Sequence, residues 1–250
     1  LLAAIDHRTA VVALPQVHWA DGTLFDLVHI GERARECHAL LVVDGTQSVG
    51  ALPFDVDHIR PDALICAGYK WLLGPYSVGL AYLGPAFEDG TPLEENWIVR
   101  RGSEAFADLV HYRDEYQPAA IRYDVGERSN FTLLPMLTAA LELVLGWTVP
   151  AIQDYCRALT TDLTRTLRER GYWIEEDRWR GAHLFGVRVV RELQNSPRGL
   201  RATCAAWVDI ERTLVRGPGS HIIAESAVES PDYHHRFTPV GSGQFPLDEL

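Results

Sequence analysis

Short apolar runs alternate with amphipathic stretches over the first third of this chain. The segment from Leu24 to Cys37, which separates two of the runs, places its apolar side chains on one face, as a crossover helix does. Apolar runs without polar alternation are typical of buried strands. The pattern predicts an α/β fold with parallel strand pairing. The runs are Ala10–Leu14, Leu40–Val43, Ala63–Cys66 and Val78–Leu83.

The second half of the chain has a different pattern. Helices are predicted over Thr132–Leu145 and Pro150–Arg170, the second opened by a proline, closed by Gly171, and carrying six apolar residues at helical spacing. A strand is expected over Leu184–Val190. Residues 88–128 predict loops that bridge two domains, with a short helix around Glu104–Val110. We therefore expect a large domain over 1–128, a small α+β domain over 129–215 and an irregular tail over 216–250.

Charge and cysteine usage exclude several classes of protein. The net charge of −11 over 250 residues does not suit binding to nucleic acid or to anionic lipid. No apolar run approaches the length of a membrane span, and the start lacks the layout of a signal peptide, so a cytoplasmic protein is expected. The four cysteines are scattered without a CxxC pair, which predicts free thiols and no metal site.

An acid and a lysine follow neighbouring apolar runs. Asp44 comes directly after one run and Lys70 shortly after the next, so both are expected at the carboxyl edge of the sheet, where open α/β sheets bind ligands. Each has an ordinary alternative: a carboxylate there often caps a helix or anchors a loop, and a lysine there is often a surface residue. Together they offer specific chemistry, because an amine can form an imine with an aldehyde while a carboxylate keeps a pyridine nitrogen protonated.

Lys70 is the single lysine of the 250 residues. All the other residues in the count of lysines and arginines are arginines. Their guanidinium group stays protonated and cannot form an imine. An imine with a side chain of this chain would therefore form at Lys70.

The stretch Val42–Pro75, with Asp44-Gly-Thr-Gln47-Ser and Gly-Tyr69-Lys70-Trp-Leu-Leu-Gly-Pro, resembles the cofactor core of the class V aminotransferases. These are fold-type I enzymes dependent on pyridoxal 5′-phosphate (PLP), and they include cysteine desulfurases, kynureninases and isopenicillin N epimerase-like proteins. The resemblance implies a mixed, mostly parallel sheet in a large domain, a small α+β C-terminal domain, a homodimer and an amino-acid substrate. It implies that Asp44 pairs with the pyridine nitrogen, Gln47 with the phenolic oxygen, Lys70 with the aldehyde as the internal aldimine, and Tyr69 with the phosphate.

Two further segments bear on the reaction. In the loop Leu14–Gly22, Trp19 stands where desulfurases carry an asparagine and kynureninases an aromatic residue, with His18 beside it. Ordinary packing beside the sheet is the alternative for both. Ser129 and Asn130 resemble the kynureninase version of a segment that reaches the neighbouring active site of a dimer. They also suit a helix N-cap, and the two roles are compatible.

Other family features are weak or missing. Cys204 faintly resembles the desulfurase nucleophile without its surrounding glycines and histidine, so a buried or inert thiol is the expectation. Arg188 and Arg216 are the only candidates for the arginine that grips the substrate carboxylate. The resemblance covers Ile5–Val190, which suggests a chain incomplete at its N-terminus and a tail altered by truncation or a frameshift.

Three functions follow as hypotheses. The first is a PLP enzyme with lyase, transaminase or epimerase chemistry, with Trp19, Ser129 and Asn130 favouring cleavage at Cβ. The second is a truncated or non-catalytic member of the same family. The third is an unrelated α/β binding domain in which Lys70 and Asp44 merely form an ion pair.

Overall fold

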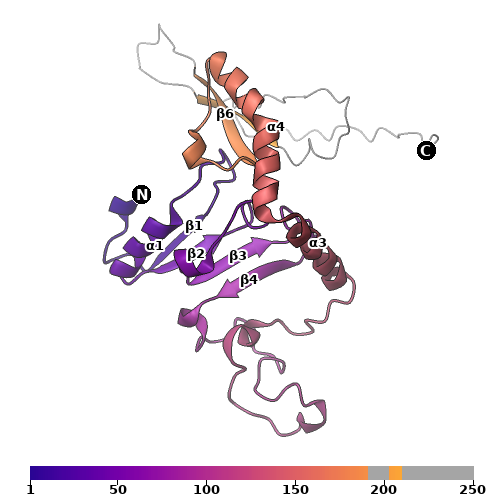
Figure 1. Cartoon of the computed structure of the whole chain (residues 1–250). Helices are drawn as coiled ribbons and strands as arrows, with labels where there is room; N and C mark the ends of the chain where they lie inside the picture. The colour runs from indigo at the N-terminus through magenta and orange to yellow at the C-terminus, as the bar shows by residue number, and fades with distance from the viewer. Residues whose placement is uncertain (191–202, 210–250) are drawn as a thin grey trace, which may run out of the picture.

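The computed structural model describes residues 1–190 and 203–209, and its centre is a four-stranded sheet (Figure 1). The strands lie in the order β1 (Val11–Pro15), β2 (Leu40–Asp44), β3 (Ala63–Ala67) and β4 (Gly79–Leu83). The β1–β2 and β2–β3 pairs are parallel and the β3–β4 pair is antiparallel. The predicted mixed, mostly parallel sheet is confirmed, with each strand within one or two residues of its apolar run.

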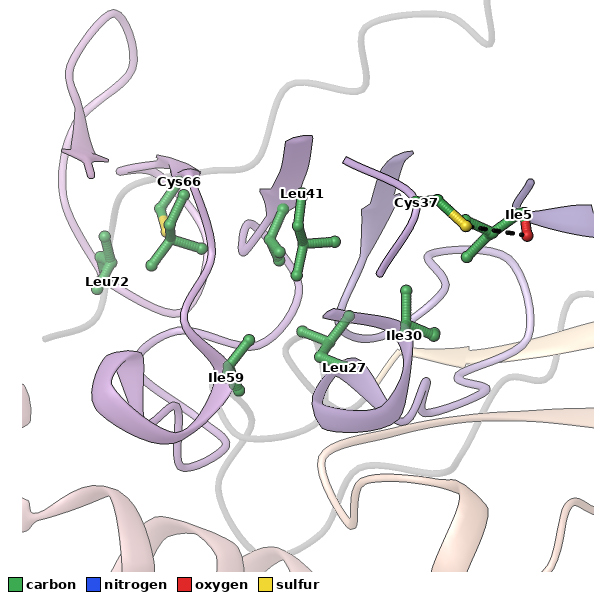
Figure 2. Packing of buried hydrophobic residues seen from close by; sticks show 10 residues of the cluster. Ile5, Leu27, Ile30, Cys37, Leu41, Ile59, Cys66 and Leu72 are labelled. Carbon is green, nitrogen blue, oxygen red and sulfur yellow. Dashed lines mark hydrogen bonds between the residues drawn. The ribbon is translucent and has the colours of Figure 1, made fainter. Parts of the chain in front are cut away.

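Two helices cover one face of this sheet and close the core. Helix α1 (Leu27–Glu36) is the predicted crossover, and its N-cap Asp26 accepts a hydrogen bond from the backbone N–H of His29. Helix α2 (Val56–Ile59) begins at Asp55 in the same way. Figure 2 shows side chains of both helices pointing toward those of the strands. The buried residues are Ile5, Leu27, Ile30, Cys37, Leu41, Val43, Ile59, Leu64, Cys66 and Leu72.

The prediction of buried strands is wrong for β4. Leu80 is 40% exposed and Tyr82 is 37% exposed. The reason is position: β4 is the last strand of the sheet and, among the described residues, pairs only with β3. Ile65 of β3, which points away from the core cluster, is 47% exposed.

Two long helices lead to a second, smaller sheet. Helix α3 (Leu133–Trp147) lies beside the first sheet, and α4 (Val149–Glu169) runs from there to the second (Figure 1). The second sheet contains β5 (Tyr172–Trp173), β6 (Leu184–Val190) and β7 (Thr203–Asp209), all antiparallel. The helices and the strand predicted here are confirmed. The tail over 216–250, including Arg216, lies outside the described residues.

The rest of the chain forms short 3₁₀ helices and loops. The short helix expected around Glu104–Val110 is a 3₁₀ turn over Phe106–Asp108. The other 3₁₀ turns are Leu2–Ala4, Pro85–Phe87, Ala119–Tyr123 and Asp177–Trp179.

The buried side of α4 is more polar than its apolar spacing suggests. The residues buried on this helix are Gln153, Cys156, Thr160 and Thr164. Tyr155 is 56% exposed and Leu159 is 47% exposed. Only Leu163 and Leu167 of the apolar series pack on the buried cluster of the second sheet, which contains Ile174, Phe185 and Val187.

Within the described residues, no single helix is long and apolar enough to cross a membrane; α3 and α4 meet that criterion only as a pair bent by 71°.

Candidate functional site at the carboxyl edge of the sheet

The carboxyl ends of β1, β2 and β3 lie at one edge of the sheet because these strands are parallel. The segments that follow them are residues 16–22, 44–50 and 67–74. They carry His18 and Trp19, Asp44 and Gln47, and Tyr69 and Lys70. The structure therefore brings most of the predicted site residues to one edge, as the sequence indicated.

Asp44 sits at the end of β2 with its carboxylate exposed. One carboxylate oxygen accepts a hydrogen bond from the backbone N–H of Thr46 at 2.9 Å, and no described residue donates to the other. The Thr46 hydroxyl accepts the backbone N–H of Ala67 at 3.1 Å, which ties the segment after β2 to the end of β3. Asp44 thus anchors a loop, which was the alternative to a role in ligand binding, and it also keeps one carboxylate oxygen open as an acceptor.

Lys70 is half-buried three residues beyond β3. Its Nζ lies 6.0 Å from the centre of the Tyr69 ring, and that ring stacks on Tyr76 at 4.4 Å. Among the described residues Lys70 forms no ion pair with Asp44 or any other acid. The hypothesis of a simple Lys70–Asp44 pair is therefore wrong for this structure, and the amine is left open.

The segments after β2 and β3 pack directly on each other. Gly50 has φ +96°, and a Cβ built on it would lie 2.4 Å from the backbone oxygen of Trp71. Only glycine allows both this left-handed conformation and this close approach. The backbone that carries Gln47 is thereby fixed against the residue that follows Lys70.

The segment after β1 is held by Asp21. The Asp21 carboxylate lies 3.1 Å from Nδ1 of His18 and forms an ion pair with Arg188 of β6. Burial raises the pKa of Asp21, but hydrogen bonds from Thr23 and the charges of His18 and Arg188 more than offset it, leaving the pKa below its usual value. The Arg188 guanidinium also lies 4.4 Å above the Trp173 ring, so in this structure it is engaged by Asp21 and Trp173.

Trp19 is 66% exposed, which argues against ordinary packing beside the sheet. Its ring centre lies 6.3 Å from that of His18.

Ser129 and Asn130 lie before α3. Asn130 Oδ1 accepts the backbone N–H of Leu133, the first residue of α3, at 2.8 Å, although the N-cap position itself is Thr132 and not Ser129 or Asn130. Ser129 is exposed, and within the described residues neither side chain hydrogen-bonds to Asp44 or Lys70. Helix α3 does reach the site's backbone, since a Cβ on Gly74 would lie 2.6 Å from Leu137.

The cysteines with described side chains, Cys37, Cys66 and Cys156, are all buried, whereas a reactive thiol is usually accessible. Cys66 is buried beneath the segment after β2, and burial together with the Asp44 charge raises the pKa of its thiol to about 11. Burial also raises the pKa of Cys156. Cys204 belongs to β7, and its side chain lies outside the described part of the structure.

Two buried polar residues at this edge were not predicted from the sequence. His183, directly before β6, is fully buried and hydrogen-bonds to the backbone oxygen of Gln47 at 2.7 Å. Gln153 of α4 hydrogen-bonds to His183 at 2.9 Å and to the backbone oxygen of Ala51 at 2.6 Å. The apolar spacing of α4 did not mark Gln153, and no local pattern marked His183, because both are held by partners far away in the chain.

The donor set at this edge fits PLP chemically. It offers a primary amine, a carboxylate with an open oxygen, a phenol from Tyr69 and the amide of Gln47, whose side chain hydrogen-bonds to none of the described residues. A family model for class-V aminotransferases matches residues 1–177. The chain belongs to the class-V aminotransferase family.

Curated relatives of this family carry enzyme names. The cysteine desulfurase of Synechococcus elongatus is 32% identical over 66% of this chain and 25% of its own length. The kynureninase of Pseudomonas fluorescens is 36% identical over 67% of this chain and 39% of its own length. The chain spans 25% to 43% of the length of the first relatives that it matches.

A solved structure of a cysteine desulfurase supports the fold. The cysteine desulfurase CsdA from Escherichia coli matches with a TM-score of 0.59 and 22% identity, over 74% of this chain and 44% of that one.

Proposed function

We propose that this chain binds PLP through Lys70, Asp44 and Gln47 and acts on an amino-acid substrate. The observation that carries the proposal is Lys70 itself: the single lysine of the sequence, half-buried, unpaired with any described acid, at the same sheet edge as Asp44. When bound, PLP supplies an aldehyde for the amine and a ring that withdraws electrons from the substrate Cα. The homodimer and the cytoplasmic location stay predictions from the sequence.

Each residue has a distinct task in this proposal. Asp44 presents its open carboxylate oxygen to a protonated ring nitrogen, and the Thr46 N–H holds that carboxylate in place. The Gln47 amide and the Tyr69 phenol donate hydrogen bonds to the phenolic oxygen and to the phosphate. Nζ of Lys70 holds the aldehyde and is the base that accepts and returns the proton of the substrate Cα.

Covalent trapping tests the proposal. Borohydride reduction of the chain with PLP should fix one cofactor per chain, and peptide mapping should place it on Lys70. Lys70→Arg keeps the positive charge but cannot form an imine, so it should remain unlabelled, as should Lys70→Ala. The α-amino group of the expressed chain is the only other primary amine. A label found there, or equal labelling of Lys70→Arg, would contradict the proposal and favour a non-catalytic family member.

Product analysis distinguishes the reaction types. A lyase that cleaves the bond beyond Cβ leaves alanine, from L-kynurenine with water as the second reactant and from L-cysteine with an added thiol such as dithiothreitol that takes up the sulfur as a persulfide. A transaminase leaves the 2-oxo acid that keeps the whole side chain of its substrate. The exposed Trp19 and the Ser129-Asn130 pair favour the lyase, and the relatives named kynureninase and cysteine desulfurase support that choice. We expect alanine as the main product, and Trp19→Ala should change the preference between the two substrates. The 2-oxo acid that keeps the whole side chain of the substrate, as the main product, would reject the lyase assignment.

A further inference from the structure

A buried polar cluster joins the second sheet to the candidate site. His183 is 0% exposed and Gln153 is 5% exposed. Gln153 Nε2 donates to Ala51 O at 2.6 Å and approaches His183 Nδ1 at 2.9 Å, while its Oε1 accepts the backbone N–H of Ala182 at 3.1 Å. His183 Nε2 lies 2.7 Å from Gln47 O. Every polar side-chain atom of the pair therefore has a partner.

These contacts fix the protonation state of the imidazole. The amide nitrogen of Gln153 is a donor, so Nδ1 must accept and Nε2 must carry the proton that is donated to Gln47 O. Burial lowers the pKa of His183 to about 4, and no charged group of the described residues faces the ring. A neutral imidazole closed off from solvent has no access to a substrate, so its contribution is geometric.

The His183 ring contacts both segments that carry the proposed cofactor residues, 44–50 and 67–74 (the cofactor segments). Through Gln47 O it holds the segment that carries Asp44, and its ring lies edge-on to Trp71 at 4.9 Å and 89°. Trp71 directly follows Lys70 in the chain. Gly50 packs on the backbone of Trp71, so the two segments already contact each other. The imidazole adds a second contact between them, through Gln47 O and the Trp71 ring.

We propose that His183 is a positioning residue that holds the segment 44–50 in the geometry required for cofactor binding. The expected effect on PLP binding rests on the proposed function. The hydrogen bond that holds the Gln47 backbone does not, and it can be measured without any cofactor. Removing the Nε2 donor leaves the part-buried Gln47 carbonyl without its hydrogen-bond partner, and the carbonyl can reach water only if the segment moves.

A matched pair of amides tests the donor. In His183→Gln the side-chain amide nitrogen reaches about where Nε2 lies and still donates to Gln47 O, whereas the shorter His183→Asn does not. Phe185→Leu is the control for general destabilisation, because Phe185 in β6 is equally buried but belongs to the buried cluster of the second sheet. If His183→Asn does not fold, His183→Phe takes its place, since it keeps the edge-on ring and lacks the donor.

Two measurements on the full chain separate the outcomes. In hydrogen exchange without cofactor, amides of residues 45–52 should exchange about tenfold faster in His183→Asn than in wild type, His183→Gln or Phe185→Leu. In PLP titration, followed by absorbance, His183→Asn should bind about tenfold more weakly while His183→Gln stays close to wild type.

Unchanged exchange at 45–52 in His183→Asn would overturn the inference. Faster exchange with unchanged PLP affinity would also overturn it, because the hold would then not serve the cofactor. A wild type that binds no PLP would reject the proposed function instead, and the hold on Gln47 would be judged by exchange alone.

Discussion

At the scale of the residue, His183 makes stability depend on pH in a defined direction. In the unfolded chain its pKa is near the ordinary 6.5, and burial lowers it to about 4 in the folded state. Between these values the unfolded state binds more protons, so the free energy of unfolding falls as the pH is lowered. From about pH 7 to about pH 5 the loss should be about 2 kcal/mol.

The measurement is urea unfolding of wild type and His183→Gln at both pH values. The glutamine does not titrate, so its loss should be smaller than that of wild type by about 2 kcal/mol, while other groups cancel in the comparison. Equal losses in the two proteins would show that His183 is not held neutral in the folded state.

Position after a strand made Asp44 and Lys70 predictable, because the edge of the sheet follows from the order of apolar runs. His183 and Gln153 were not predictable in the same way. Their partners Gln47 and Ala51 lie more than 100 residues away in the chain, and a contact at that separation leaves no local pattern. The chemistry of a site can thus be found from its motifs while the residues that hold it in place cannot.

At the scale of the element, the contact between the segments after β2 and β3 depends on one glycine. Gly50→Ala places a Cβ 2.4 Å from the Trp71 backbone oxygen and forces alanine into a left-handed conformation at φ +96°. We expect a loss of about 3 kcal/mol in the free energy of unfolding. Weaker PLP binding should accompany it, because the two cofactor segments must separate.

Gly146→Ala is the matched control for this change. Gly146 lies in α3, and a Cβ built there meets nothing within 4 Å. The same substitution should therefore stabilise by about 0.5 kcal/mol through helix propensity. Chemical denaturation of both variants checks the pair, and a Gly50→Ala protein as stable as wild type would refute the close approach.

The type and position of the helices and strands were predicted well, but which of their side chains are buried was predicted less well. Strand and helix bounds follow from local patterns of apolar residues, which is why β1 to β4, α3 and α4 all lie where expected. Burial depends on neighbours: β4 is exposed because it ends the sheet, and α4 buries Gln153 while exposing Tyr155 because its partners are polar. Neither outcome is encoded in the spacing of the segment itself.

At the scale of the whole molecule, residues far apart in the chain join the two sheets. Asp21, after β1, pairs with Arg188 of β6 and accepts the backbone N–H of Gly186 at 2.8 Å through its own carbonyl. His183 and Gln153 make the second link, to the segment after β2. The sheets should therefore unfold together, because separating them would break the Asp21–Arg188 ion pair and leave His183 and Gln153 without their carbonyl partners after β2.

A double-mutant cycle on Asp21 and Arg188 tests that coupling. Asp21→Asn keeps an acceptor for the Thr23 backbone and removes the charge, and Arg188→Met keeps the apolar stem that covers Trp173. The two side chains are 20% and 30% exposed, so the coupling energy should be about 1 to 2 kcal/mol by urea unfolding. Asp162 and Arg165 form a comparison pair on α4 at 89% and 59% exposure, where the coupling should stay below about 0.5 kcal/mol. If the Asp21–Arg188 coupling were no larger, the ion pair would be a surface contact that does not hold the sheets together, and the hydrogen bonds of His183 would have to join the second sheet to the site on their own.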